Sequence, residues 1–154
     1  MGVLPPNLGD LADIEAIRQL KAAYFRSIDT KDWDLLGTLF TEDGILDAGG
    51  GPRRGPTEIV RVLSKALDDV STVHHGHTAE ITITGDGTAT GIWAMDDRLE
   101  WGWESASVGA AVGFHGAGHY RDTYRRGDDG AWRFEHVVLS RLRVDPLPGG
   151  MPRR

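Results

Sequence analysis

The chain has 154 residues, 40% of them hydrophobic and 26% charged, a composition that favours one soluble globular domain over a disordered or membrane protein. The net charge of −6, with scattered basic residues, disfavours nucleic-acid binding, and the absence of cysteine excludes disulfides, thiolate catalysis and cysteine-type zinc sites. Because no apolar run approaches the ~18 residues of a membrane span and the N-terminus lacks a secretion signal, we expect a cytoplasmic protein without membrane contact.

The first half of the sequence predicts helices. Residues 1–9 contain two prolines and a glycine and predict a flexible arm, after which a helix begins at Asp10 or Asp13. Apolar residues recur along it at every third or fourth position and form one stripe: Ile14, Ile17, Leu20, Tyr24 and Ile28. A second short helix is predicted over 31–40 and a strand over 44–48. A glycine-rich turn then precedes a third helix that Thr57 is positioned to cap.

The second half predicts strands, over 71–83, 88–99, 114–126 and 131–144, with hairpin turns at 85–87 and 127–130. Segment 105–113 could be a strand or a flap over a site, and 146–154 predicts an irregular tail. Helices followed by antiparallel strands indicate an α+β fold made by one domain over 10–145. A curved sheet closed by helices would form a cone with a largely apolar pocket.

Three of the six histidines, His74, His75 and His77, lie together where the first long strand begins. Imidazole can act as an acid or a base near neutral pH, although a loop histidine taken alone is more often without function. With Asp97 these residues offer donor atoms for zinc or iron. Adjacent residues of a strand point to opposite faces, however, and no second helical pair of ligands supports them. We therefore expect neither a metal ion nor a cofactor.

Several motifs resemble the SnoaL-like, scytalone dehydratase-like branch of the nuclear transport factor 2 (NTF2-like) superfamily. They are Tyr-Phe-Arg-Ser-Ile-Asp-Thr-Lys-Asp-Trp-Asp at 24–34, Thr-Val-His-His-Gly at 72–76, Tyr-Arg-Asp at 120–122 and Gly-Ala-Trp-Arg-Phe at 130–134. The resemblance covers residues 10–145. It implies three N-terminal helices packed on a strongly curved, antiparallel (mixed) sheet that encloses a pocket. It also implies a hydrophobic small-molecule substrate and a homodimer or homotrimer.

The resemblance also implies roles for individual residues. In lyases of this family an aspartate late in the first helix orients a histidine at a strand mouth, and the histidine removes a proton while a leaving group departs. These positions correspond to Asp29 and His74. Tyr24 matches a residue that assists the leaving group, and Asp97 matches a second pocket acid. The residues expected to line the pocket and bind substrate are Trp33, His75, Trp93, Phe114, Tyr120 and His136.

Each role has a structural alternative. Asp29 could cap the turn into the second helix, Tyr24 could be a core tyrosine, and Asp97 could be a solvated acid at a strand end. The arginine that relatives carry after the last tryptophan is replaced near that place by His136, with Arg141 and Arg143 further on.

The sequence therefore predicts a cofactor-independent lyase or cyclase with an Asp–His pair, acting on a hydroxylated or carbonyl-bearing hydrophobic molecule. A non-catalytic binding protein and an isomerase of the ketosteroid isomerase type are the alternatives.

Overall fold

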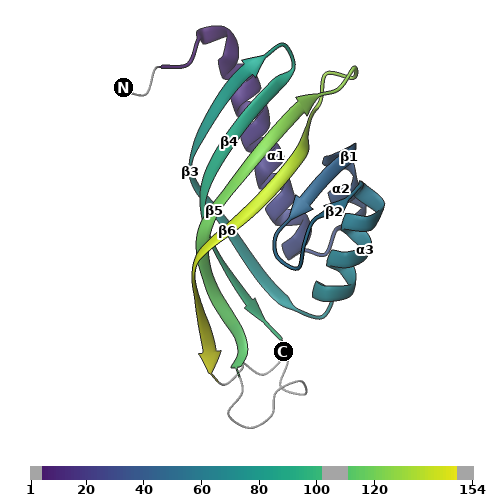
Figure 1. Cartoon of the computed structure of the whole chain (residues 1–154), viewed down its shortest axis with the longest axis vertical. Helices are drawn as coiled ribbons and strands as arrows, with labels where there is room; N and C mark the ends of the chain where they lie inside the picture. The colour runs from purple at the N-terminus through teal and green to yellow at the C-terminus, as the bar shows by residue number, and fades with distance from the viewer. Residues whose placement is uncertain (1–4, 102–110, 149–154) are drawn as a thin grey trace.

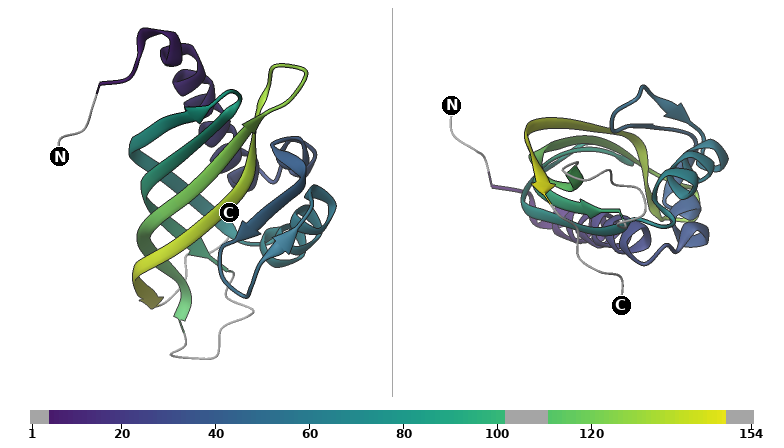
Figure 2. Two further views of the ribbon diagram at one scale, coloured as in Figure 1. Left: turned by 45° about the horizontal axis from the view of Figure 1, so that its top comes forward. Right: turned by 90° about the horizontal axis from the view of Figure 1, so that it is seen from below.

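The computed structural model of the protein describes residues 5–101 and 111–148. Its architecture is the predicted α+β fold, in which helices pack against one strongly bent, mixed six-stranded sheet (Figure 1). Helix α1 lies along one face of the sheet, whereas α2 and α3 gather beside β1 and β2 (Figure 2). The helices are the 3-10 helix η1 (Leu8–Asp10), α1 (Leu11–Asp29), α2 (Trp33–Thr38) and α3 (Pro56–Leu67). The strands are β1 (Phe40–Asp47), β2 (Arg53–Arg54), β3 (Ser71–Gly85), β4 (Thr88–Glu100), β5 (Ala111–Arg126) and β6 (Trp132–Pro148).

The sheet has the strand order β2-β1-β6-β5-β4-β3, with β1 parallel to β6 and every other neighbouring pair antiparallel. The predicted turn at 85–87 joins β3 to β4, and that at 127–130 joins β5 to β6. Each contains a glycine, Gly87 or Gly130, with the positive φ that such turns need. This pairing places the start of β3 and the ends of β4 and β6 at the same end of the sheet.

The apolar stripe of α1 faces the core as predicted. Its five residues from Ile14 to Ile28 are all at most 8% exposed. Tyr24 is central among them, since its ring makes edge-on contacts with the rings of Phe40, Tyr120 and Phe134. The amphipathic pattern of α1 thus fixes which face of the helix meets the sheet.

A buried ion pair also ties α1 to the sheet. The ammonium of Lys21 donates to Asp122 Oδ2 of β5 at 2.8 Å, and both side chains are at most 1% exposed. Burial lowers the pKa of Lys21 and raises that of Asp122, while the attraction between the two partners opposes both changes. Tyr124 donates a further hydrogen bond to the same Asp122 oxygen.

The two shorter helices differ from the prediction at their ends. The second helix spans only Trp33–Thr38, because Asp32 caps it by accepting from the Leu35 amide and because Phe40 already pairs with β6. The predicted cap of the third helix is wrong. Gly55, with φ of +81°, precedes the first helical residue Pro56, and Thr57 lies inside the helix.

Strand β6 runs to Pro148, so residues 146–148 are not the irregular tail that was predicted. Pro146 and Pro148 pair with β5 through Phe114 and Ala111. Among the strands that the structure describes, β1 pairs with β6 only between Phe134 and Val138, so beyond that point β6 is an edge of the described sheet, where proline is tolerated. Residues 149–154 of the predicted tail and 105–110 of the predicted strand or flap lie outside the described residues, and 111–113 belong to β5.

Candidate active site

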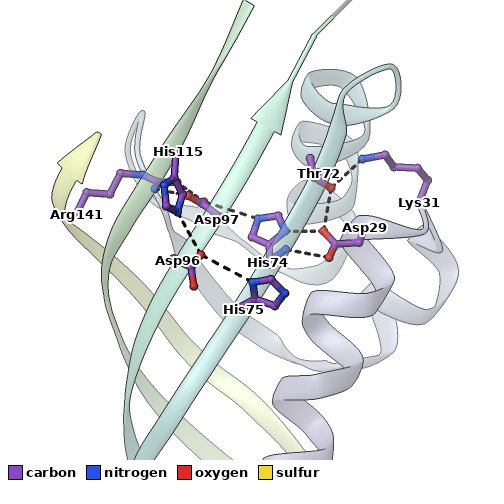
Figure 3. A network of polar contacts seen from close by, with 9 residues as sticks. All are labelled: Asp29, Lys31, Thr72, His74, His75, Asp96, Asp97, His115 and Arg141. Atoms are coloured by element: carbon purple, nitrogen blue, oxygen red, sulfur yellow. Dashed lines mark hydrogen bonds and ion pairs between the residues drawn. The ribbon is translucent and has the colours of Figure 1, made fainter. Parts of the chain in front are cut away.

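Asp29 is the last residue of α1 and points at the start of β3 (Figure 3). Its Oδ1 accepts from Thr72 Oγ1 at 2.9 Å and lies 2.6 Å from His74 Nδ1, and its Oδ2 accepts from the His74 amide at 2.9 Å. Asp32, not Asp29, caps α2. The aspartate and the histidine that the sequence singled out are therefore brought together.

The electrostatics favour an ionised Asp29. Partial burial acts to raise the pKa of its carboxyl group, but the hydrogen bonds from the His74 side chain and backbone, together with that from Thr72, outweigh burial and lower it. A carboxylate beside Nδ1 fixes the imidazole ring and leaves Nε2 as the nitrogen that can exchange a proton with another molecule.

The side chain of His74 is largely buried but keeps a small solvent-exposed area. Its side chain is 7% exposed, and its ring stacks on Phe25 of α1 with centroids 6.0 Å apart and planes at 8°. Nε2 lies 3.9 Å from Asp97 Oδ2, beyond hydrogen-bond distance. The free nitrogen of His74 thus faces a second carboxylate without being bonded to it.

Asp97 is a buried acid rather than a solvated one, with its side chain 1% exposed. Arg141 of β6 binds it through two hydrogen bonds, Nη1 to Oδ1 at 2.7 Å and Nη2 to Oδ2 at 2.6 Å. The guanidinium neutralises the buried carboxylate and remains 26% exposed. This pair crosses the intervening strand β5 at Gly116, where an added Cβ would overlap both Arg141 Nη1 and Asp97 Oδ1.

Figure 3 shows the resulting row of polar groups, which runs from Lys31 through Thr72, Asp29, His74 and Asp97 to Arg141. Its members come from the end of α1, the turn that follows it, and β3, β4 and β6. The arrangement can take a proton at His74, stabilise the resulting cation through Asp29, and offer the cationic Arg141 to developing negative charge.

Tyr24 and Tyr120 lie deeper, in the aromatic core. Both are about 2% exposed, and the ammonium of Lys21 lies 3.6 Å from the centroid of the Tyr120 ring. Burial raises the pKa of both hydroxyl groups. The negative charge of Asp122 raises both pKa values further. Tyr24 therefore fits the alternative role of a core tyrosine.

The remaining predicted binding residues separate into two groups. Phe114 lies under Arg141, with the guanidinium carbon 5.0 Å from its ring centroid, and so adjoins the polar row. Trp33 donates instead to Asp68, at 3.0 Å, and His136 is half-buried near Asp122. The structure thus places Phe114 beside Arg141 and Trp33 at the opposite, Lys31 end of the row, with its ring centroid 6.0 Å from the Lys31 ammonium, whereas the charge that His136 faces is Asp122.

Trp93 lines a cavity of about 310 Å³ between α1, β3 and β4. Phe25 is common to this cavity and to the stacking contact with His74. Neither Asp29 nor His74 is among the residues that line it.

The structure places His75, one of the predicted binding residues, outside the polar row, because side chains alternate along β3 and this one points to the face opposite His74. His75 is 61% exposed and lies with His77 and His115 around Asp96, on the face opposite His74. The donor set that had suggested a metal site is therefore divided between two faces. Within 5–101 and 111–148, no group of three or more His, Asp or Glu side chains is arranged to hold a metal ion.

Three residues of the polar row were not assigned a role from the sequence: Lys31, Thr72 and Arg141. Thr72 is two residues before His74 in a strand, so alternation alone could have placed it beside Asp29. Arg141 could be found only from the register of β6, because its partner Asp97 is two strands away.

A model of the SnoaL-like domain family matches residues 9–138. Among solved structures, a type 2 hexachlorocyclohexane dehydrochlorinase, LinA, is similar with a TM-score of 0.80 and 20% identity over 97% of each chain. Protein Rv3472 from Mycobacterium tuberculosis, of unknown function, has a TM-score of 0.72 and 27% identity over 86% of this chain and 77% of its own.

A Novosphingobium aromaticivorans protein with the provisional description scytalone dehydratase has a TM-score of 0.76 and 19% identity, over 94% of this chain and 97% of its own. Among the described residues, no helix is long and apolar enough to cross a membrane.

Proposed function

The chain belongs to the SnoaL-like domain family, and from this premise we propose that it is a cofactor-independent lyase that uses Asp29 and His74 as its acid–base pair. The 2.6 Å contact between His74 Nδ1 and Asp29 Oδ1 carries the proposal. The dehydrochlorinase and the provisional scytalone dehydratase with the same fold support an elimination reaction over other chemistry.

In this proposal His74 Nε2 takes a proton from a substrate carbon. The electrons of the broken C–H bond form a new double bond, and the leaving group departs from the neighbouring carbon. Asp29 stabilises the imidazolium while the proton is held, and general acid–base catalysis of this kind contributes about 10²- to 10⁴-fold in rate.

Arg141 is the group that would stabilise negative charge on the leaving atom or on an enolate oxygen. Asp97 accepts two of the five N–H donors of its guanidinium, and the other donors of this partly exposed group are left for a substrate oxygen or halogen. Phe114 beneath it would supply an apolar surface for the substrate. We therefore propose a hydrophobic substrate that bears a hydroxyl or carbonyl group next to an acidic C–H bond.

The test is a panel of β-hydroxy carbonyl compounds on aromatic or polycyclic frames, with loss of water followed by mass spectrometry. His74→Ala and Asp29→Asn should each reduce turnover by about 10²- to 10⁴-fold. The matched control is His115→Ala, which removes a histidine that also pairs with an aspartate, on the opposite face of the sheet.

Turnover that survives both substitutions would refute the proposed pair. Product with the mass of the substrate would identify an isomerase that uses the same base. Binding without any product, and with affinity unchanged in His74→Ala, would identify a binding protein.

A further inference from the structure

Lys31 has a backbone conformation that lysine seldom adopts. With φ of +61° it is the one residue other than glycine with positive φ in the described part of the chain. It follows Thr30, the C-cap residue of α1, and this is the position where glycine is usual because it has no Cβ to strain. The geometry of the turn would favour glycine, so the presence of lysine at this position points to a role for its side chain.

The side chain of Lys31 returns toward Asp29. Its ammonium donates to Thr72 Oγ1 at 3.2 Å, and the Thr72 hydroxyl in turn donates to Asp29 Oδ1 at 2.9 Å (Figure 3). Because a hydroxyl has a single proton, accepting from Lys31 obliges Thr72 to point that proton at Asp29. The three groups therefore form a directed chain that ends on the oxygen bonded to His74.

Other charges also surround the pair of Asp29 and His74. Asp97 of β4 lies 3.9 Å from His74 Nε2 and is bound by Arg141 of β6. Asp68, after α3, also attracts the Lys31 ammonium, and the Trp33 ring lies 6.0 Å below it. Since Arg141 already offsets Asp97, Lys31 is the cation that acts on the Asp29 side of His74.

We infer that Lys31 is a positioning residue that, through Thr72, holds Asp29 ionised and aimed at His74 and so limits the proton affinity of the pair. This inference rests on the proposed role of the pair in catalysis. A base that must be unprotonated to act benefits from a neighbouring cation, which disfavours the charged imidazolium.

The test is a proton titration of the free protein by NMR, following the Asp29 carboxyl carbon and the His74 Cε1 proton, with His74→Gln used for assignment. Because 2.6 Å separates His74 Nδ1 from Asp29 Oδ1, the quantity measured is the proton affinity of the pair and not that of either group alone. In Lys31→Met this affinity should rise by ~3–10-fold, because a positive charge is lost a few ångströms away.

Two further variants separate charge from backbone. Lys31→Gly relieves the positive φ and also removes the ammonium, so it should fold well and show the same rise as Lys31→Met. Lys31→Arg keeps the charge and should titrate as the unmodified protein does.

An unchanged titration in Lys31→Met and Lys31→Gly would overturn the inference, as would an equal rise in Lys31→Arg. Because no substrate is needed, an inactive protein with the expected titration would contradict the proposed function and leave this inference standing.

Discussion

Asp29 is ionised in the folded state because β3 surrounds it with hydrogen-bond donors, and this makes stability depend on pH. A folded-state pKa below the unfolded value of about 3.9 means that the folded protein binds this proton less tightly than the unfolded chain. The ionised Asp29 therefore stabilises the fold fully at pH values above its pKa in the unfolded chain. This stabilisation is lost as the pH falls through the pKa of Asp29 in the folded protein.

We predict that the stability difference between the unmodified protein and Asp29→Asn is largest near neutral pH and narrows below about pH 4. Urea unfolding of both proteins at several pH values measures it. A difference that stays constant, or grows, on acidification would contradict the hydrogen-bonded state of Asp29 described here.

The sequence indicated some, but not all, of the residues of the candidate active site. Asp29 and His74 could be predicted because each stands in a motif whose family position is distinctive. His75 lies on the face of β3 opposite His74, which motif spacing alone does not reveal. The bidentate partner of Asp97 could not be chosen, because Arg141 and Arg143 are equivalent in sequence until the pairing of β5 with β6 is known.

Strand β5 has to leave room for the ion pair that crosses it. Gly116 is buried directly beside Asp97 in the register, and its missing side chain is what lets Arg141 reach across from β6. A larger residue there would displace the guanidinium and leave Asp97 buried without its cation.

We predict that Gly116→Val lowers turnover and destabilises the protein by about 3–5 kcal/mol, the usual cost of breaking a buried ion pair. Gly9→Ala is a control for simple loss of a glycine, because Gly9 has no positive φ and an added Cβ there would meet only Asn7 Oδ1, at 3.8 Å. Chemical denaturation gives the stability. A stable Gly116→Val protein with full activity would show that the crossing pair is dispensable.

Elements with strong periodicity were predicted best. Helix α1 and strands β3 to β6 follow from their apolar patterns and glycine turns, whereas the ends of α2 and β6 depend on neighbours far away in the sequence. Phe40 joins β1 because Phe134 pairs with it, and Pro146 continues β6 because only one side of that strand is occupied.

In the whole molecule, Lys21 and Asp122 join the helical layer to the sheet across 101 positions of sequence. We predict that Lys21→Met destabilises the fold by about 3–5 kcal/mol, because it leaves the Asp122 carboxyl buried without a cation. Urea denaturation monitored by tryptophan fluorescence measures this loss.

The double substitution Lys21→Met with Asp122→Asn should recover much of that stability, since it removes the unpaired charge and keeps an acceptor for Tyr124. An equal loss of stability in the single and double variants would mean that the unpaired charge of Asp122 does not cause the destabilisation.

The position of β6 between β1 and β5 determines when the sheet can be completed during synthesis of the polypeptide. A ribosome releases β1 early, yet the strand on which β1 docks is the last to emerge, so nearly the whole chain must be synthesised before the sheet can close. Until then β1 has only β2 as a neighbour, so the edge that will meet β6 stays unpaired, and an exposed strand edge promotes aggregation.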